Sequence, residues 1–210
     1  MSVKIPEESK NFKLLGHDAS AAWGGGSIVE IHKGFAYVGA VGSASYNGPE
    51  GFTVHDVRDP RKPRKVAEVK SPPGVHSHKL RVVDGDFLYV NSERLGGDAG
   101  RNARTGLFIF DISKGGEPKQ VGFYDLPGTG PHRFGVDNKR KLAMLPNNAP
   151  GWNGRVIWTL DISNPLKPEV ISQFGLPWMK ATDGDGDFGA AAPHEEAVTL
   201  HGPPTIRGNR

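Results

Sequence analysis

The chain has 210 residues, of which 29 are glycine and 17 are proline, and its formal net charge is only +3. So many turn-forming residues exclude a mostly helical protein and favour short strands joined by turns. The absence of cysteine excludes disulfides and thiolate metal sites. The first residues lack the apolar core of a secretory signal, and no stretch approaches the roughly 18 apolar residues of a membrane span. The sequence therefore predicts a soluble, cytoplasmic protein with no membrane partner.

The basic residues are scattered apart from one run, "RDPRKPRK", between Arg58 and Lys65. Such a run can bind phosphates or anionic lipid, but a solvated turn between strands is the favoured interpretation. We therefore expect no nucleic-acid partner.

The first predicted element is residues 11–18, "NFKLLGHD", which follow an N-terminus (1–10) expected to be flexible. This segment resembles "PKQVGFYD" further along the chain, which is the predicted last strand of a four-stranded unit. We therefore expect 11–18 to be a leading fourth strand.

Three later segments repeat one pattern: "GFTVHDVRDPRKPRKV", "GLFIFDISKGGEPKQV" and "GRVIWTLDISNPLKPEVI". Each has a glycine, an apolar strand, an aspartate (Asp56, Asp111 or Asp161) and a proline seven residues beyond it. The aspartates are 55 and 50 residues apart. A period of about 50 residues is typical of repeat folds such as propellers.

A second pattern interlocks with the first, because strands begin after His78, His132 and His201, and Gly26 occupies the histidine position of the first copy. Each unit then contains a tight turn, a second strand, a variable loop, the aspartate strand and a fourth strand. This predicts an all-β fold, a β-propeller of four-stranded antiparallel blades. The predicted parts are blades at 26–70, 78–126 and 132–176, a loop insert at 177–197, and a trailing first strand at 201–210.

Three blades make an incomplete propeller, because a closed ring needs at least about four. We therefore expect a piece of a longer chain, whose missing C-terminal blades, or copies of itself, cover the open blade edges.

The segments "VHDVRDP", "IFDISKG" and "TLDISNP" resemble the repeat of the LVIVD-repeat β-propellers. The resemblance covers about residues 11–210 and implies the fold but no common reaction. The sequence departs from the family's repeat at Lys114-Gly115, where the repeat has Asn/Asp-Pro. This difference predicts a looser turn at that position. The arrangement is also similar, by analogy alone, to the selenium-binding/methanethiol oxidase propellers, whose histidines are associated with copper.

The three repeated histidines are candidate metal ligands. By the repeat geometry His78, His132 and His201 lie at the same channel mouth on adjacent blades. Neutral imidazole is the commonest protein ligand for transition metals, so we expect a divalent Zn, Cu or Fe ion with open positions for water or substrate. The alternative is structural, since a histidine in this loop of WD-repeat propellers locks its own blade through a hydrogen bond.

The loops on the predicted histidine face are long, which is typical of functional loops. The insert holds "DGDGDFG", with Asp183, Asp185 and Asp187 spaced as in a calcium loop, although Phe188 and His194 break the EF-hand pattern. A flexible acidic lid is therefore favoured over calcium. In "PHEE", Glu195 or Glu196 is a candidate fourth ligand or general base, with surface carboxylates as the alternative.

Alternate ligands are His76 and His194, since His76 and His78 form a His-x-His pair whose side chains share one side of a strand. Asn91, Glu93 and Arg94 end a second strand, and Arg94 is a candidate for orienting a substrate anion. Two functions follow: a metal-dependent enzyme acting on a small molecule, or a non-catalytic scaffold whose long loops bind a protein or small ligand.

Overall fold

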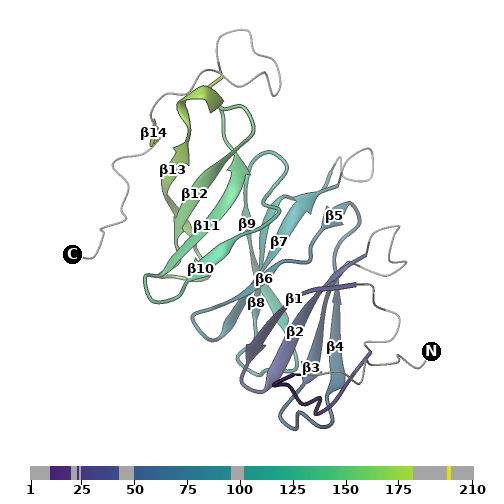
Figure 1. Ribbon diagram of the computed structural model, residues 1–210. Coiled ribbons are helices and arrows are strands. Elements are labelled where there is room, and N and C mark those ends of the chain that lie inside the picture. The colour runs from purple at the N-terminus through teal and green to yellow at the C-terminus, as the bar shows by residue number, and fades with distance from the viewer. Residues whose placement is uncertain are drawn as a thin grey trace.

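The computed structural model describes residues 10–19, 23, 25–42, 50–95, 102–181 and the backbone of 198–199. These residues form three antiparallel sheets that follow one another along the chain (Figure 1). They contain no α-helix, only the 3-10 helix η2 (Pro177–Met179), and no helix among them has the length and apolarity needed to cross a membrane. The all-β prediction is confirmed.

The strands divide into an N-terminal, a central and a C-terminal sheet. The N-terminal sheet contains β1 (Gly25–His32), β2 (Phe35–Val41), β3 (Gly51–Asp56) and β4 (Arg64–Lys70). The central sheet contains β5 (Val75–His76), β6 (Leu80–Val83), β7 (Phe87–Arg94), β8 (Gly106–Asp111) and β9 (Lys119–Asp125). The C-terminal sheet contains β10 (Gly135–Asp137), β11 (Leu142–Asn148), β12 (Arg155–Asp161), β13 (Glu169–Gly175) and β14 (Val198–Thr199).

The repeated aspartates occupy the same place in all three sheets. Each ends the third strand and pairs with the first residue of the second strand, the pairs being Phe35–Asp56, Phe87–Asp111 and Leu142–Asp161. The carboxylate then accepts a hydrogen bond from the backbone N–H two residues on, at 2.8 Å for Asp111 and 2.7 Å for Asp161. This local turn explains why aspartate recurs at the end of the strand.

The sheets stack face to face, so the central sheet is buried on both sides. Alternate residues of β7 enter different cores: Leu88 packs with Tyr37 and Phe52 of the N-terminal sheet. Its neighbour Tyr89 packs with Leu145 of the C-terminal sheet. Because successive side chains of a strand point to opposite faces, β7 contributes to the core on each side of the central sheet.

Two tyrosines at equivalent positions also join neighbouring sheets. The Tyr37 hydroxyl donates to the Gly115 carbonyl at 3.0 Å, and the Tyr89 hydroxyl donates to the Pro165 carbonyl at 2.7 Å. Gly115 has φ 73°, and a Cβ there would lie 2.3 Å from the Phe35 ring. The Lys114-Gly115 turn, predicted to be looser, is thus held closely against the N-terminal sheet.

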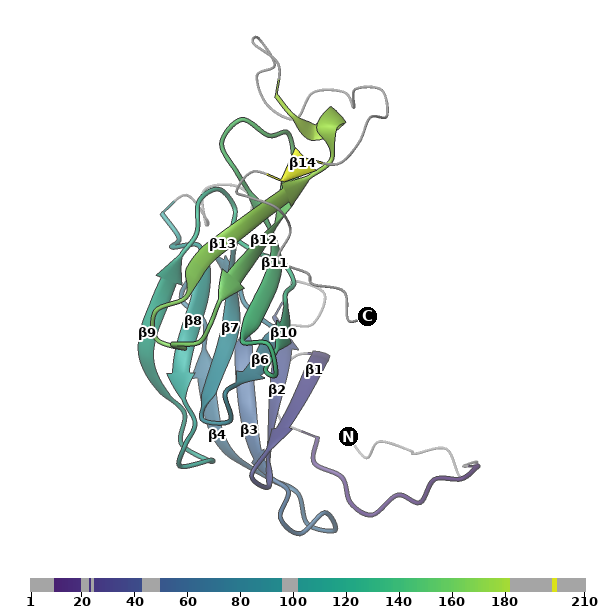
Figure 2. The same ribbon diagram turned by 90° about the vertical axis from the view of Figure 1, so that its left-hand side faces the viewer.

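The first strands of the sheets lie together at the centre, where β6 contacts both β1 and β10. The sheet order then places β4 and β9 at the opposite edges of their sheets, and the three sheets fan outward, as Figures 1 and 2 show. The segments entering β6 and β10 carry the candidate histidines.

The predicted leading strand is wrong. Residues 12–19 have no regular secondary structure, and Asp18 instead accepts a hydrogen bond from the Lys65 backbone N–H at 2.7 Å. The segment has strand-like composition, but none of the strands in the three described sheets pairs with it, and a strand needs such a partner for its backbone groups. The predicted trailing strand, 201–210, lies outside the described residues.

Candidate metal centre

The inner edge of the central sheet is interrupted where the histidines lie. Both β5 and β6 pair with β7, and the chain between them leaves the ladder. There the fully buried Asn91 side chain replaces a strand as the hydrogen-bond partner of the backbone. Its Oδ1 accepts hydrogen bonds from the backbone N–H groups of His78 at 3.0 Å and Lys79 at 2.8 Å. An amide oxygen has two lone pairs, so one residue satisfies both donors and fixes the backbone at His78.

The same amide ties the two histidine segments together. Its Nδ2 donates to the His76 carbonyl and to the Pro131 carbonyl, each at 3.1 Å. Pro131 directly precedes His132. Asn91 therefore links the backbones that carry all three histidines.

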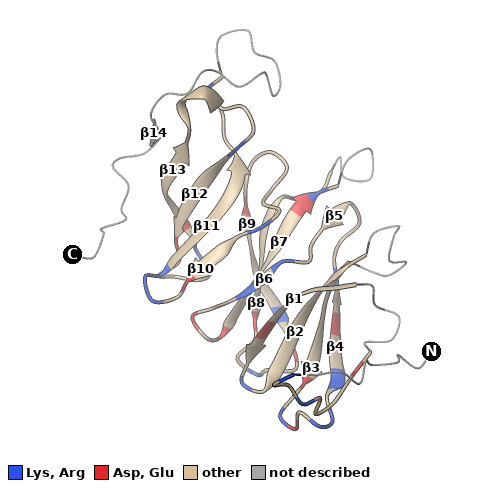
Figure 3. Ribbon diagram, viewed as in Figure 1, with Lys and Arg blue, Asp and Glu red and all other residues tan. Residues whose placement is uncertain are grey.

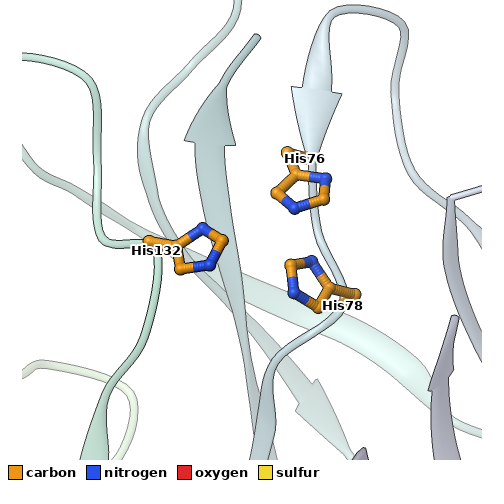
Figure 4. Close-up of side chains that lie close together, drawn as sticks. All are labelled: His76, His78 and His132. Atoms are coloured by element: carbon orange, nitrogen blue, oxygen red, sulfur yellow. The ribbon is translucent and has the colours of Figure 1, made fainter. Parts of the chain in front are cut away.

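The rings of His76, His78 and His132 gather in one space (Figure 4). One nitrogen from each lies within 4.8 Å of those of the other two. The ring centroids are 4.0 Å apart for His76 and His78, 5.4 Å for His78 and His132, and 5.5 Å for His76 and His132. Two ligands at about 2.0–2.1 Å from one ion are at most about 4.2 Å apart. Two nitrogens that lie 4.8 Å apart would therefore have to move at least roughly 0.6 Å closer together to bind one ion.

Two of the imidazoles have their Nδ1 atoms bonded to carboxylates. His132 Nδ1 lies 2.5 Å from Glu93 Oε2, and His76 Nδ1 lies 2.8 Å from Glu50 Oε1. An ionised carboxylate only accepts, so each Nδ1 carries a hydrogen, and in the neutral form of such a ring Nε2 is the nitrogen with the lone pair. This carboxylate–histidine arrangement is the one that orients metal-binding imidazoles in proteins.

Both carboxylates are themselves held in place. Burial would raise the pKa of Glu50, but hydrogen bonds from His76 and from the Ser77 backbone N–H outweigh it and lower the pKa. The other oxygen of Glu93 accepts from Arg155 Nη2 at 2.5 Å, and Arg155 also donates to Thr129 Oγ1 at 3.1 Å. Because Glu93 lies on β7 and Arg155 on β12, this network joins two sheets.

His78 is the most buried member, with 3% of its surface exposed. Burial, followed by the neighbouring His76 and Lys79, lowers its pKa to about 3, so its ring is neutral at neutral pH. Its Nδ1 is buried and has no hydrogen-bond partner. Buried polar atoms are nearly always satisfied, and a cation held by the three rings is one way to satisfy this atom. The residues present therefore fit a divalent metal.

The structure brings His78 and His132 together, and His76, expected only as an alternate, lies with them. The alternative was a histidine that locks its own blade, but His76 and His132 instead bond to carboxylates contributed by neighbouring sheets. The remaining predicted ligands and bases lie outside the described residues: His194, His201, Asp183, Asp185, Asp187, Glu195 and Glu196.

Arg94 is exposed and follows Glu93 on β7. Strand alternation directs its side chain to the face opposite Glu93, so it does not join the histidine group. Its role toward a substrate stays a prediction.

Sequence reasoning missed Glu50 and Arg155 and gave Glu93 no role at His132. Each contacts the centre across 26 to 62 residues of chain. The residues next to them in the sequence form no pattern that indicates these hydrogen bonds, whereas the His-x-His spacing did indicate His76 as a ligand.

The described chain thus defines an all-β repeat protein with a three-histidine cluster between two of its sheets. No family model matches the chain, and no curated protein matches it significantly. The resemblance to the LVIVD-repeat propellers stays a prediction.

Proposed function

We propose that His76, His78 and His132 bind one divalent transition metal, Zn, Cu or Fe, and that the protein is a metal-dependent enzyme acting on a small molecule. The observation that carries the proposal is the convergence of three imidazole nitrogens within 4.8 Å, two of them oriented by carboxylates. Three neutral ligands leave the charge of the ion uncompensated and its other coordination positions open.

The chemistry that such an ion supplies is activation of a bound water or polarisation of a bound oxygen. The chain's own contribution is to hold the rings. Glu50 and Glu93 fix the orientation of His76 and His132, and Asn91 fixes the backbone that presents His78. Ions with three histidine ligands and an open position are typical of catalytic rather than structural sites.

We also infer a β-propeller of the LVIVD-repeat kind, with further blades or further copies of the chain packed on its outer sheets. The tyrosine contacts support this, since the position of Tyr37 and Tyr89 is occupied in the C-terminal sheet by Met144, which is 43% exposed. The same sheet exposes Ile157 and Phe174, and the N-terminal sheet exposes Val29 and Ile31. Such apolar faces favour a neighbouring sheet.

One observation favours the second candidate, a non-catalytic binding scaffold. The bonds from His76 to Glu50 and from His132 to Glu93 each join residues contributed by neighbouring sheets, so both could serve to lock the sheets together. In this function the histidines carry no ion, and the long loops bind a protein or small ligand.

Metal analysis of the protein purified without added metal, followed by zinc titration of the chelator-treated protein, distinguishes the two functions. Metal binding predicts about one ion per chain, lost in His78→Ala and His132→Ala and kept in His17→Ala, an exposed histidine elsewhere. The scaffold predicts no stoichiometric metal and a loss of roughly 1–3 kcal/mol in His132→Ala.

A further inference from the structure

A small hollow of about 180 Å³ lies between the inner strands of the sheets. Lys79, Arg81 and Arg133 line it together with the apolar side chains of Ile28 and Phe134. Ile28 belongs to β1, Arg81 to β6, and Arg133 to the segment entering β10, so all three sheets contribute. Figure 3 shows Lys and Arg on the ribbon where β6 and β10 begin.

The positive charge of this hollow is only partly compensated. Arg81 donates to Glu30 Oε1 at 3.3 Å, and Lys79 Nζ donates to Ser27 Oγ at 2.7 Å. Arg133 is exposed and has no hydrogen bond or ion pair within the described chain. Three cationic side chains therefore have one bonded carboxylate between them, where like charges normally repel one another.

The hollow is also adjacent in sequence to the candidate metal centre. Lys79 directly follows His78 and Arg133 directly follows His132. The backbone that presents two of the rings therefore also presents two of the cations.

The cationic side chains that line the hollow favour binding of an anion. Arginine offers a planar fork of donors that matches carboxylate and phosphate oxygens, and lysine adds a point charge. The volume is below the roughly 300–1,000 Å³ of sites for drug-sized ligands, which indicates a small molecule rather than a polymer.

We propose that Lys79, Arg81 and Arg133 bind the carboxylate or phosphate group of a small molecule. This inference rests on the proposed function in one respect: it makes that anion the substrate class of the metal centre. Arg133 is then a substrate-binding residue, since it is the cation left without a partner.

The test is calorimetric titration of the metal-free wild-type protein with inorganic phosphate and, separately, with acetate. Arg133→Gln should weaken binding of the preferred probe at least about tenfold, because a charge-assisted bidentate contact is lost. Arg61→Gln, which removes the same charge from an exposed turn residue, should bind as the wild type does. Preference for phosphate or for acetate identifies the chemical group.

No saturable binding of either probe, or equal weakening by Arg133→Gln and Arg61→Gln, would overturn the proposal. Zinc titration of the same proteins separates the two sites. Zinc binding without anion binding contradicts this inference alone. Anion binding without zinc binding contradicts the metal centre, and with it the role of the anion as substrate, while the anion site stands.

Discussion

His132 Nδ1 lies 2.5 Å from Glu93 Oε2, although the two residues are 39 positions apart, with Glu93 on β7 and His132 in the segment entering β10. The second oxygen of the same carboxylate accepts from Arg155. Glu93 therefore positions an imidazole and neutralises a guanidinium at once, which makes it the residue on which the geometry of His132 most depends.

Replacing this carboxylate by its neutral isostere tests that dependence. In Glu93→Gln the ring loses a charged acceptor and Arg155 loses its counterion. We expect zinc affinity to fall about 10- to 100-fold, as is usual when a group behind a metal ligand is changed. Calorimetric zinc titration of chelator-treated protein measures this.

The matched control is Glu117→Gln, at an exposed position on the β8–β9 turn. It should leave zinc affinity unchanged. Equal affinities in wild type and Glu93→Gln would mean that Glu93 does not orient a ligand.

Asn91 provides the second prediction. Asn91→Ala removes the acceptor for two backbone N–H groups and the donor for two carbonyls. We expect the free energy of unfolding to fall by roughly 2–4 kcal/mol, because buried backbone groups are left unsatisfied. Zinc binding should weaken as well, since the segment presenting His78 is no longer fixed.

Urea unfolding of Asn91→Ala, beside the exposed control Asn102→Ala, measures the effect. A loss no larger than that of the control would show that the interrupted strand does not depend on the amide.

The strands could be predicted because their signals are local. Alternating apolar residues, Gly or Pro at the turns and the aspartate at the end of the third strand all lie within a few residues of one another. The register of the repeat also placed His78 and His132 at equivalent positions, and β6 and β10 begin just after them.

The remaining features depend on distant partners. Residues 11–18 have the composition of a strand, but no strand of the described sheets pairs with them, and β pairing is a property of two segments rather than one. The partnership of His76 with Glu50 depends likewise on how two sheets pack, which a periodic pattern in either segment does not specify.

The tyrosine contacts between sheets yield the third prediction. Burial raises the pKa of Tyr37 to about 12, so its phenol stays protonated and donates to Gly115. We expect Tyr37→Phe and Tyr89→Phe each to lower the free energy of unfolding by roughly 1–3 kcal/mol, because each leaves a carbonyl without its donor.

Tyr124→Phe is the control, since within the described chain its hydroxyl makes no hydrogen bond. Thermal or urea unfolding of the three variants provides the comparison. If all three lose the same stability, the two hydrogen bonds do not hold the sheets together.

The last prediction concerns pH and the metal-free protein. Burial, with the neighbouring His76 and Lys79, lowers the pKa of His78 from its usual 6.5 to about 3. Above pH 6.5 the ring is neutral in both the folded and the unfolded chain, so it contributes no pH dependence. Below pH 6.5 the unfolded chain binds a proton that the folded chain does not, so stability is lost as the pH falls toward 3. At pH 5 the loss from this one residue should be about 2 kcal/mol relative to pH 8.

The comparison of wild type with His78→Gln isolates this effect between pH 5 and pH 8, because the other seven histidines are the same in both proteins. Carboxyl groups whose pKa is lowered, such as Glu50 and Asp111, are also unchanged between them. Urea unfolding across the interval, in the presence of a chelator, should give a slope that His78→Gln reduces by about one proton. An identical slope in the wild type and in His78→Gln would mean that the buried ring binds its proton in the folded chain as readily as in the unfolded one. It would then lack the neutral character that a metal ligand at this position requires.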